Sequence, residues 1–307
     1  MKKLAFVAWW DWFNHTKSAD FLVESLKKDF IIEKFSRPNW TMKHNPNIHE
    51  LNKNNFDTIL FFYELPPARY LHKLSCKNIV WVPMYDSQKG LILAKTKFLF
   101  YKFLNIKVIC FSKKIIYELN PFFNCKYFQY FPKPKKQIKF NKKRLLFWER
   151  RDELEWDFLR NNIINENDFD SILIKQNKDG LAKKNIKIKE TTKIKITNKW
   201  LSEREYDKIM DSNNIFVAPR LKEGIGHSFL NVLSRGYIVI ANNDSTMNEY
   251  IENEKTGFLF DYNKPKKIDL SNKIKLKKVS NNCYSFMKKG YKEWTNKQKE
   301  LIDWISN

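Results

Sequence analysis

NIFVAPRLKEGIGHSFLNVLSRGYIVIANNDSTMNEYIENEKTGFLFD, residues 214–261, carries the strongest structural signal in the chain. An apolar run ends at Pro219, a loop follows, and apolar residues then recur at helical spacing before a second apolar run at 237–241. Four of the seven glycines in the chain lie here, namely Gly224, Gly226, Gly236 and Gly257. The alternation of strand, helix and strand predicts a parallel sheet with helices on both faces.

The loop Glu223-Gly224-Ile225-Gly226 comes where the first of these strands has ended and a helix begins near His227. Free backbone N–H groups and the positive end of a helix dipole meet at such a point, which suits a phosphate group. Ligands of open parallel sheets bind beyond the carboxyl ends of the strands, where this loop would lie. We therefore expect a phosphate-bearing ligand here.

The same stretch resembles the donor-binding signature of the family 4-type glycosyltransferases (glycosyl transferases group 1), which have the GT-B fold. The matching residues are Pro219, Glu223 to Gly226, Gly236, Val239-Ile240-Ala241, Glu249 and Gly257. The resemblance is close over residues 214–261 and only architectural over the rest of the chain. It implies a glycosyltransferase that binds a nucleotide-sugar donor through this segment.

The resemblance also implies roles for individual residues. Glu223 would contact the hydroxyls of the donor sugar as a catalytic residue, and Glu249 would bind the donor. Gly224, Ile225, Gly226 and His227 would line the donor phosphates, although His227 is nearly as well explained as an exposed residue. The family's ribose-binding glutamate is replaced by Asn231, which can hydrogen-bond a hydroxyl but lacks charge assistance.

Cations for a diphosphate are expected after the first strand of the second half. Arg150 or Arg151 matches the arginine that the family places there, whereas the family's lysine is replaced by Glu155. Lys175 or Lys178, after the next strand, would substitute as a point charge. Pairing of the two arginines with neighbouring carboxylates is the alternative.

Apolar runs predict the remaining architecture. The expected strands are 4–9, 57–63, 78–83, 108–112, 144–148, 171–175, 193–197, 214–219 and 237–241. Residues 18–30 have the helical period, and Ser202 with Glu205 forms a capping box that predicts a helix start. The fold class is therefore α/β of the GT-B type, with two Rossmann-like domains facing a cleft and C-terminal helices returning toward the first domain.

The expected domain limits follow from this pattern. An N-terminal acceptor domain would span 1–135 and a nucleotide-sugar domain 136–282, joined by a basic linker at 132–143. One or two amphipathic helices would occupy 283–307 and pack back toward the first domain.

The acceptor would bind at the carboxyl ends of the first-domain strands. Trp10 and Trp12 follow the first strand and would stack on a sugar, with Asp11 between them as a hydroxyl anchor or base. Packing of these tryptophans in a seam between the domains is the alternative. Glu64 and Asp86 end two further strands and are also expected to bind the acceptor.

The net charge of +23 favours anionic partners. A nucleotide sugar, a glycan or lipid-linked acceptor and an anionic membrane surface fit this charge, and an AT-rich coding sequence is the alternative cause. No nucleic acid is expected, because no recognised nucleic-acid module is visible. Apolar runs are too short to cross a bilayer, so we expect a cytoplasmic protein, at most peripheral at the inner face of the membrane.

Neither a cofactor nor a metal is expected. Asp168-Phe169-Asp170 spells a DxD motif, but a polar segment stands where the preceding strand should be. Cys76, Cys110, Cys125 and Cys283 are scattered, without the spacing of a metal site.

These observations predict transfer of a sugar from a nucleotide-sugar donor to a glycan or lipid-linked glycan. The setting would be surface polysaccharide assembly of the bacterial type, such as lipopolysaccharide or capsule. The resemblance implies a retaining, metal-independent mechanism, whereas an inverting enzyme would need Asp11 as its base. A noncatalytic GT-B subunit and a basic nucleic-acid-binding protein are the two alternatives.

Overall fold

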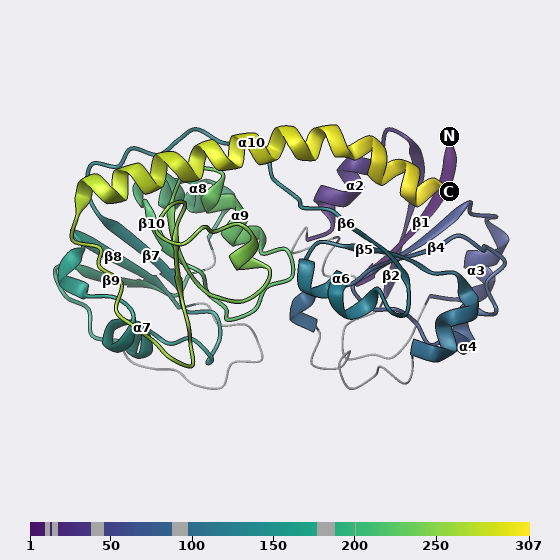
Figure 1. Ribbon diagram of the computed structural model, residues 1–307, viewed down its shortest axis with the longest axis horizontal. Helices are drawn as coiled ribbons and strands as arrows, with labels where there is room; N and C mark the ends of the chain where they lie inside the picture. Colours follow the sequence, from purple (N-terminus) through teal and green to yellow (C-terminus); the bar gives the residue numbers. More distant parts are fainter. Residues whose placement is uncertain (10–12, 14–17, 38–45, 88–97, 177–187, 200) are drawn as a thin grey trace. The chain divides into compact units, whose positions relative to one another are not determined.

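The computed structural model describes the chain apart from residues 10–12, 14–17, 38–45, 88–97, 177–187 and 200. It divides into two compact units. Unit 1 comprises Met1–Tyr130 with Glu293–Asn307, and unit 2 comprises Phe131–Lys292. Each unit holds one six-stranded sheet in which the paired strands run parallel, flanked by helices (Figure 1). The predicted α/β fold class is confirmed.

Unit 1 has the strand order β2-β1-β3-β4-β5-β6. The strands are β1 (Lys2–Trp9), β2 (Phe30–Arg37), β3 (Thr58–Phe62), β4 (Ile79–Val82), β5 (Lys107–Cys110) and β6 (Asn124–Tyr127). The helices are α2 (Asp20–Leu26), α3 (Ile48–Lys53), α4 (Ala68–Leu71) and α6 (Lys113–Leu119), with the 3₁₀ helices η1 (Tyr85–Ser87) and η3 (Leu99–Leu104).

Unit 2 has the strand order β12-β11-β10-β7-β8-β9. The strands are β7 (Arg144–Trp148), β8 (Ser171–Lys175), β9 (Ile194–Thr197), β10 (Ile215–Val217), β11 (Ile238–Asn242) and β12 (Phe258–Phe260). The helices are α7 (Trp156–Asn162), α8 (Glu203–Ser212), α9 (His227–Leu233) and α10 (Lys273–Ser306), with η4 (Glu166–Asp168) and η5 (Met247–Glu249).

Side chains of β7 alternate between two apolar layers of unit 2. Phe147 packs against Trp156 of α7, with ring centroids 6.3 Å apart. Leu146 points the other way and lines a narrow pocket together with Met210 of α8. Figure 1 likewise shows α7 on one side of this sheet and α8 on the other. Because both faces are covered, the central strands are continuous apolar runs.

Helix α10 is one 34-residue helix and contributes to both units. In unit 2, Ser280 Oγ donates to the carbonyl of Gly236 at 2.5 Å. Gly290 touches the Phe131 ring so closely that a Cβ there would lie 2.3 Å from it. In unit 1, Trp294 packs on Tyr130, and the last turn accepts a hydrogen bond from Lys2 Nζ at the Ser306 carbonyl.

Two segments differ from the predicted pattern. The helix expected over residues 18–30 ends at Leu26, and Phe30 instead opens β2 beside β1. The expected linker lies along unit 2, where the amides of Lys135 and Ile138 donate to the carbonyls of Ser234 and Arg235. Within the described residues, no helix is both long and apolar enough to span a membrane.

Candidate functional site

The strand order of unit 2 reverses between β7 and β10. The chain runs outward from β7 through β8 to β9, then crosses over to β10 and runs outward the other way. The chain leaves β7 and β10 in opposite directions there, and the carboxyl ends of strands at such a reversal are where ligands of open parallel sheets bind. The amide of Leu221, after β10, donates to Glu153 Oε1, after β7, at 3.2 Å. This hydrogen bond joins the two loops directly at the switch point.

Hydrogen bonds from Thr246 fix the glycine-containing loop after β10. The Thr246 hydroxyl lies 2.5 Å from the Gly224 carbonyl and 3.0 Å from that of Glu223. Glu223 is only 5% exposed, and its Oε2 lies 3.7 Å from Arg220 Nη1. Gly226 has φ +69° at the N-cap of α9, a left-handed conformation that favours glycine. The loop thus presents a buried carboxylate beside a helix start.

Two cations surround Trp148 at the carboxyl ends of β7 and β8. Lys175 Nζ lies 4.1 Å and Arg150 Cζ 5.0 Å from the Trp148 ring centroid. Lys175 is 8% exposed, and burial together with the Arg150 charge lowers the pKa of its ammonium group. Two positive charges that lie against the same tryptophan ring are suited to binding an anion such as a diphosphate.

The adjacent Glu149 is fully buried and organises the same edge. Its carboxylate accepts hydrogen bonds from Gln176 Nε2 at 2.7 Å and from the Trp156 amide at 3.4 Å. It therefore links the end of β8 to the start of α7. Trp148 and Gln176 were not predicted from the sequence, because their contacts depend on the pairing of β7 with β8.

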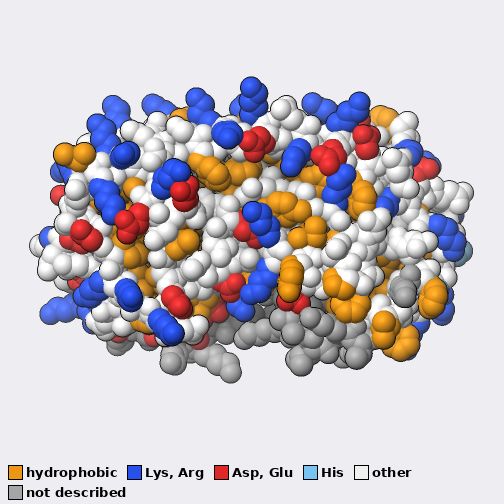
Figure 2. All heavy atoms as spheres, viewed as in Figure 1, with side chains coloured by type: hydrophobic (Ala, Val, Ile, Leu, Met, Phe, Trp, Pro, Cys, Tyr) orange, Lys and Arg blue, Asp and Glu red, His pale blue; other side chains and the backbone are white. Residues whose placement is uncertain are grey.

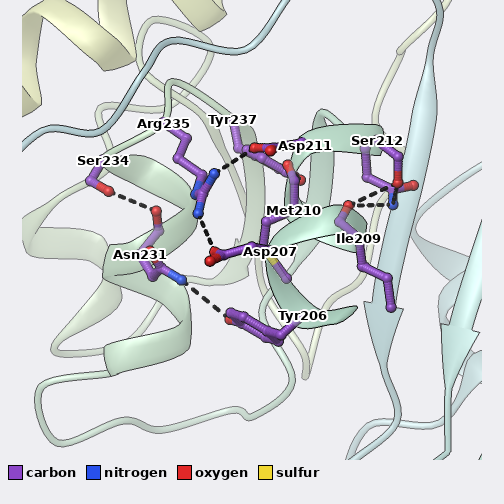
Figure 3. Close-up of polar contacts among 11 residues, drawn as sticks. Tyr206, Asp207, Ile209, Met210, Asp211, Ser212, Asn231, Ser234, Arg235 and Tyr237 are labelled. Atoms are coloured by element: carbon purple, nitrogen blue, oxygen red, sulfur yellow. Dashed lines mark hydrogen bonds and ion pairs between the residues drawn. The ribbon is translucent and has the colours of Figure 1, made fainter. Parts of the chain in front are cut away.

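Asn231, which the resemblance predicts to bind the ribose, contacts α8. Its Nδ2 donates to Tyr206 Oη at 3.3 Å (Figure 3). Burial raises the pKa of the Tyr206 hydroxyl, so this group stays neutral. Tyr206 also lines the narrow pocket of unit 2, which is formed by Leu146, Trp148, Lys175, Leu201, Tyr206, Ile209, Met210, Phe216 and Ser228. The Asn231–Tyr206 contact thus adjoins the pocket that Lys175 and Trp148 line.

A buried arginine fixes α8 in this position. Arg235 is 6% exposed, and its guanidinium donates to Asp211 at 2.7 Å and to Asp207 at 2.8 Å (Figure 3). Tyr237 Oη adds a hydrogen bond to the carbonyl of Met210 at 2.6 Å. The contacts tie the turn after α9 to α8, and so position the helix that carries Tyr206.

Other residues of unit 2 that the sequence singled out make separate contacts or lie outside the described residues. Glu249, in η5, accepts a hydrogen bond from Ser245 Oγ at 3.3 Å, and His227 is exposed at the first position of α9. In the DxD motif, from which no metal site was expected, Asp170 Oδ2 accepts a hydrogen bond from the Lys143 amide at 2.6 Å. Asp170 precedes β8 and therefore lies at the amino edge of the sheet, opposite to the loops of the site. Lys178 lies outside the described residues.

Unit 1 has its own switch point, between β1 and β3. Trp9 and Tyr63, at the ends of these strands, have ring centroids 4.8 Å apart. The predicted acceptor residue Glu64 follows β3 and is exposed, and Asp86 lies in η1 after β4. Trp10, Asp11 and Trp12 lie outside the described residues.

Comparison with known proteins agrees with this architecture. Residues 175–291 match the family model described as glycosyl transferases group 1. No curated protein sequence is similar enough to the chain to count as a match. The matched range includes Lys175, Tyr206, Glu223 and Asn231, so most of the site lies within it.

Solved structures similar to this chain include sucrose-phosphate synthase from Thermosynechococcus elongatus, with TM-score 0.68, 13% identity and coverage of 99% of this chain and 98% of that one. HepE from Anabaena in complex with UDP and glucose has TM-score 0.65 and 10% identity, with both chains covered completely. A glycosyltransferase from Rickettsia africae has TM-score 0.59 and 11% identity, covering 99% and 98% of the two chains. At such low identities these structures show that the chain has the GT-B fold, and residues 175–291 are in addition similar to the glycosyl transferases group 1.

Proposed function

We propose that this enzyme transfers a sugar from a nucleoside-diphosphate sugar to a glycan or lipid-linked glycan during assembly of a surface polysaccharide such as lipopolysaccharide or capsule. The observation that carries the proposal is the pairing of a cationic cluster with a buried carboxylate loop at one switch point. Two similar structures support the nature of the donor. HepE was solved with UDP and glucose, and the pneumococcal O-GlcNAc transferase GtfA with UDP and GlcNAc.

The donor diphosphate would be bound by Lys175, Arg150 and the backbone amides of residues 224–226. Lys175 and Arg150 already lie on one tryptophan ring, so little side-chain entropy is lost when an anion binds. These cations, together with Arg151, would neutralise the departing diphosphate, and the reaction would then need no divalent metal. The ribose would lie near Asn231.

Glu223 would orient the donor sugar. Its buried carboxylate can accept hydrogen bonds from sugar hydroxyls in a site of low dielectric constant, where such bonds are strong. In the proposed retaining step, the bond between the anomeric carbon and the diphosphate oxygen breaks while the acceptor oxygen attacks from the same face. The acceptor hydroxyl proton passes to the departing diphosphate.

The acceptor would bind to unit 1, at the carboxyl ends of β1, β3 and β4, where Glu64 and Asp86 lie. An acceptor on a lipid carrier would bring the enzyme to the inner face of a membrane as a peripheral protein. Asp11 would serve as base if the reaction inverted the anomeric configuration.

Calorimetric titration of the whole chain with UDP, GDP and ADP tests the donor site. We expect Lys175→Gln to weaken binding of the preferred nucleotide by ~10-fold or more, because a charge-assisted contact is lost. Lys195→Gln, an exposed lysine of β9 in the same unit, should leave it unchanged. Equal affinity in both variants would contradict the assignment. Activity lost with EDTA and restored by Mn²⁺ would contradict metal independence.

A further inference from the structure

The 3₁₀ helix η3 of unit 1 exposes large apolar side chains to solvent. Leu99 is 60% exposed, Phe100 70% and Phe103 85%. Side chains three positions apart in a 3₁₀ helix lie above one another, so Phe100 and Phe103 form one row. Exposed apolar clusters of this kind mark interaction sites for proteins or membranes.

The opposite row of η3 anchors it firmly. Phe98, directly before η3, is buried and packs edge-to-face against Phe123 with ring centroids 5.3 Å apart. Tyr101, three positions later, packs on the same core and donates a hydrogen bond to the carbonyl of Pro66 at 3.1 Å. Because Phe98 and Tyr101 hold η3 against the core, the other row, with Phe100 and Phe103, faces the solvent.

Helix α4, which lies in contact with η3, contributes basic side chains to this part of unit 1. Pro66, which Tyr101 contacts, lies two residues before α4, and exposed Arg69 and Lys73 lie in and just after that helix. Residues 58–122 contain ten Lys and Arg against three Asp and Glu. Figure 2 shows orange side chains at the lower right, around the place where Figure 1 labels α4.

We propose that η3 is a membrane-docking element whose Leu99, Phe100 and Phe103 insert into the headgroup region of an anionic bilayer. The aromatic rings would enter the acyl boundary, while Arg69 and Lys73 would stay at the level of anionic headgroups. Apolar insertion and charge attraction act together, which is the combination that gives stable peripheral binding. A neutral protein partner would not account for the excess of positive charge. This inference does not depend on the identity of the donor.

The test is flotation of the whole chain with phosphatidylcholine vesicles, with and without about 30% phosphatidylglycerol. We expect binding to the anionic vesicles that weakens as salt rises from low to physiological concentration. Phe100→Ser/Phe103→Ser should weaken it by ~10-fold or more, and Phe100→Leu/Phe103→Leu should largely retain it. Arg69→Gln/Lys73→Gln should weaken it for anionic vesicles only.

The matched control is Ile31→Ser/Ile274→Ser, which removes two exposed apolar side chains elsewhere (54% and 85% exposed) and should not affect binding. All variants should bind UDP as the wild type does, which separates this proposal from the donor assignment. Binding that the serine pair leaves unchanged would overturn the proposal. A wild-type dimer that the serine pair dissociates, without vesicle binding, would do so as well and would identify a second copy as the partner.

Discussion

The side-chain amide of Asn231 donates to the hydroxyl of Tyr206 at 3.3 Å, and this contact links α9 to α8. A glutamate at position 231 would present a carboxylate to the same hydroxyl. The asparagine is thus held by a neutral partner whose position Arg235 in turn fixes through Asp207. The asparagine that replaces the family's glutamate at this position therefore has a defined hydrogen-bond partner, Tyr206.

Asn231→Ala should weaken UDP binding about 2- to 10-fold, the usual effect of losing one neutral hydrogen bond. If the lost bond is to the ribose, the variant should no longer distinguish UDP from its 2′,3′-dideoxy analogue. Calorimetry with both ligands measures this, and Asn263→Ala, at an exposed position of unit 2, is the control. A variant that keeps the wild-type preference would place the ribose elsewhere.

UDP affinity should fall as pH rises toward alkaline values. The pKa of Lys175 is lowered by burial and by Arg150, so this lysine loses its proton below the ordinary value of 10.5. Only the protonated form attracts a diphosphate, and a bound diphosphate raises the pKa again. Binding should therefore take up protons, which titrations in buffers of different ionisation enthalpy detect.

Lys175→Arg should retain affinity and lose this pH dependence, because a guanidinium stays charged throughout the range. The same UDP dissociation constant at about pH 7 and 10 in the wild type, without proton uptake, would contradict a role for Lys175 in diphosphate binding.

Glu223→Gln should lower the rate of transfer by ~10²-fold or more while UDP affinity stays within ~3-fold of wild type. The amide keeps the volume of the buried side chain but cannot accept hydrogen bonds with both atoms. Steady-state kinetics with a thermal-melting check measure the effect. Glu252→Gln, at an exposed carboxylate of the same unit paired with Lys255, should retain full activity. An unchanged rate in a folded Glu223→Gln protein would refute the assignment.

Asp207→Asn/Asp211→Asn should lower the free energy of unfolding of unit 2 by about 1–3 kcal/mol. Both carboxylates are largely exposed, but Arg235 is buried and would lose its charged partners. Urea unfolding followed by circular dichroism measures the change. Asp157→Asn, which breaks the exposed pair with Arg160, should cost less than about 1 kcal/mol. Equal effects would show that the Arg235 cluster adds no more than a surface ion pair.

Central strands of both sheets were predicted from the sequence because burial on both faces leaves continuous apolar runs. The strands β2, β6 and β12 were missed, and all three lie at sheet edges. The edge strands β2 and β6 are partly solvated, so β2 carries Glu33 and Lys34 and has a polar sequence, whereas β12 is apolar but only three residues long. The prediction that the helix continues through Phe30 was wrong because the polar residues of β2 hid the strand that Phe30 opens.

The glycine-containing loop after β10 could be located from the sequence because its glycines and Glu223 follow one another in the chain. Trp148, Gln176 and Tyr206 could not be, because each acquires its role from a partner far away in the sequence. Tyr206, for example, meets Asn231 only when α8 packs beside α9. Apolar spacing in α8 indicates a buried face but not what that face contacts.

Release of free nucleoside diphosphate from a panel of nucleotide sugars, followed with the whole chain, tests the central claim most directly. We predict that one donor is cleaved slowly without acceptor and faster with a glycan acceptor. Glu223→Gln should lower both rates by ~10²-fold or more while the variant still binds the nucleotide. The contradicting result is a chain that neither binds nor cleaves any donor in the panel but binds oligonucleotides tightly. In that case the proposed donor site is wrong, and the basic surface of the protein binds nucleic acid.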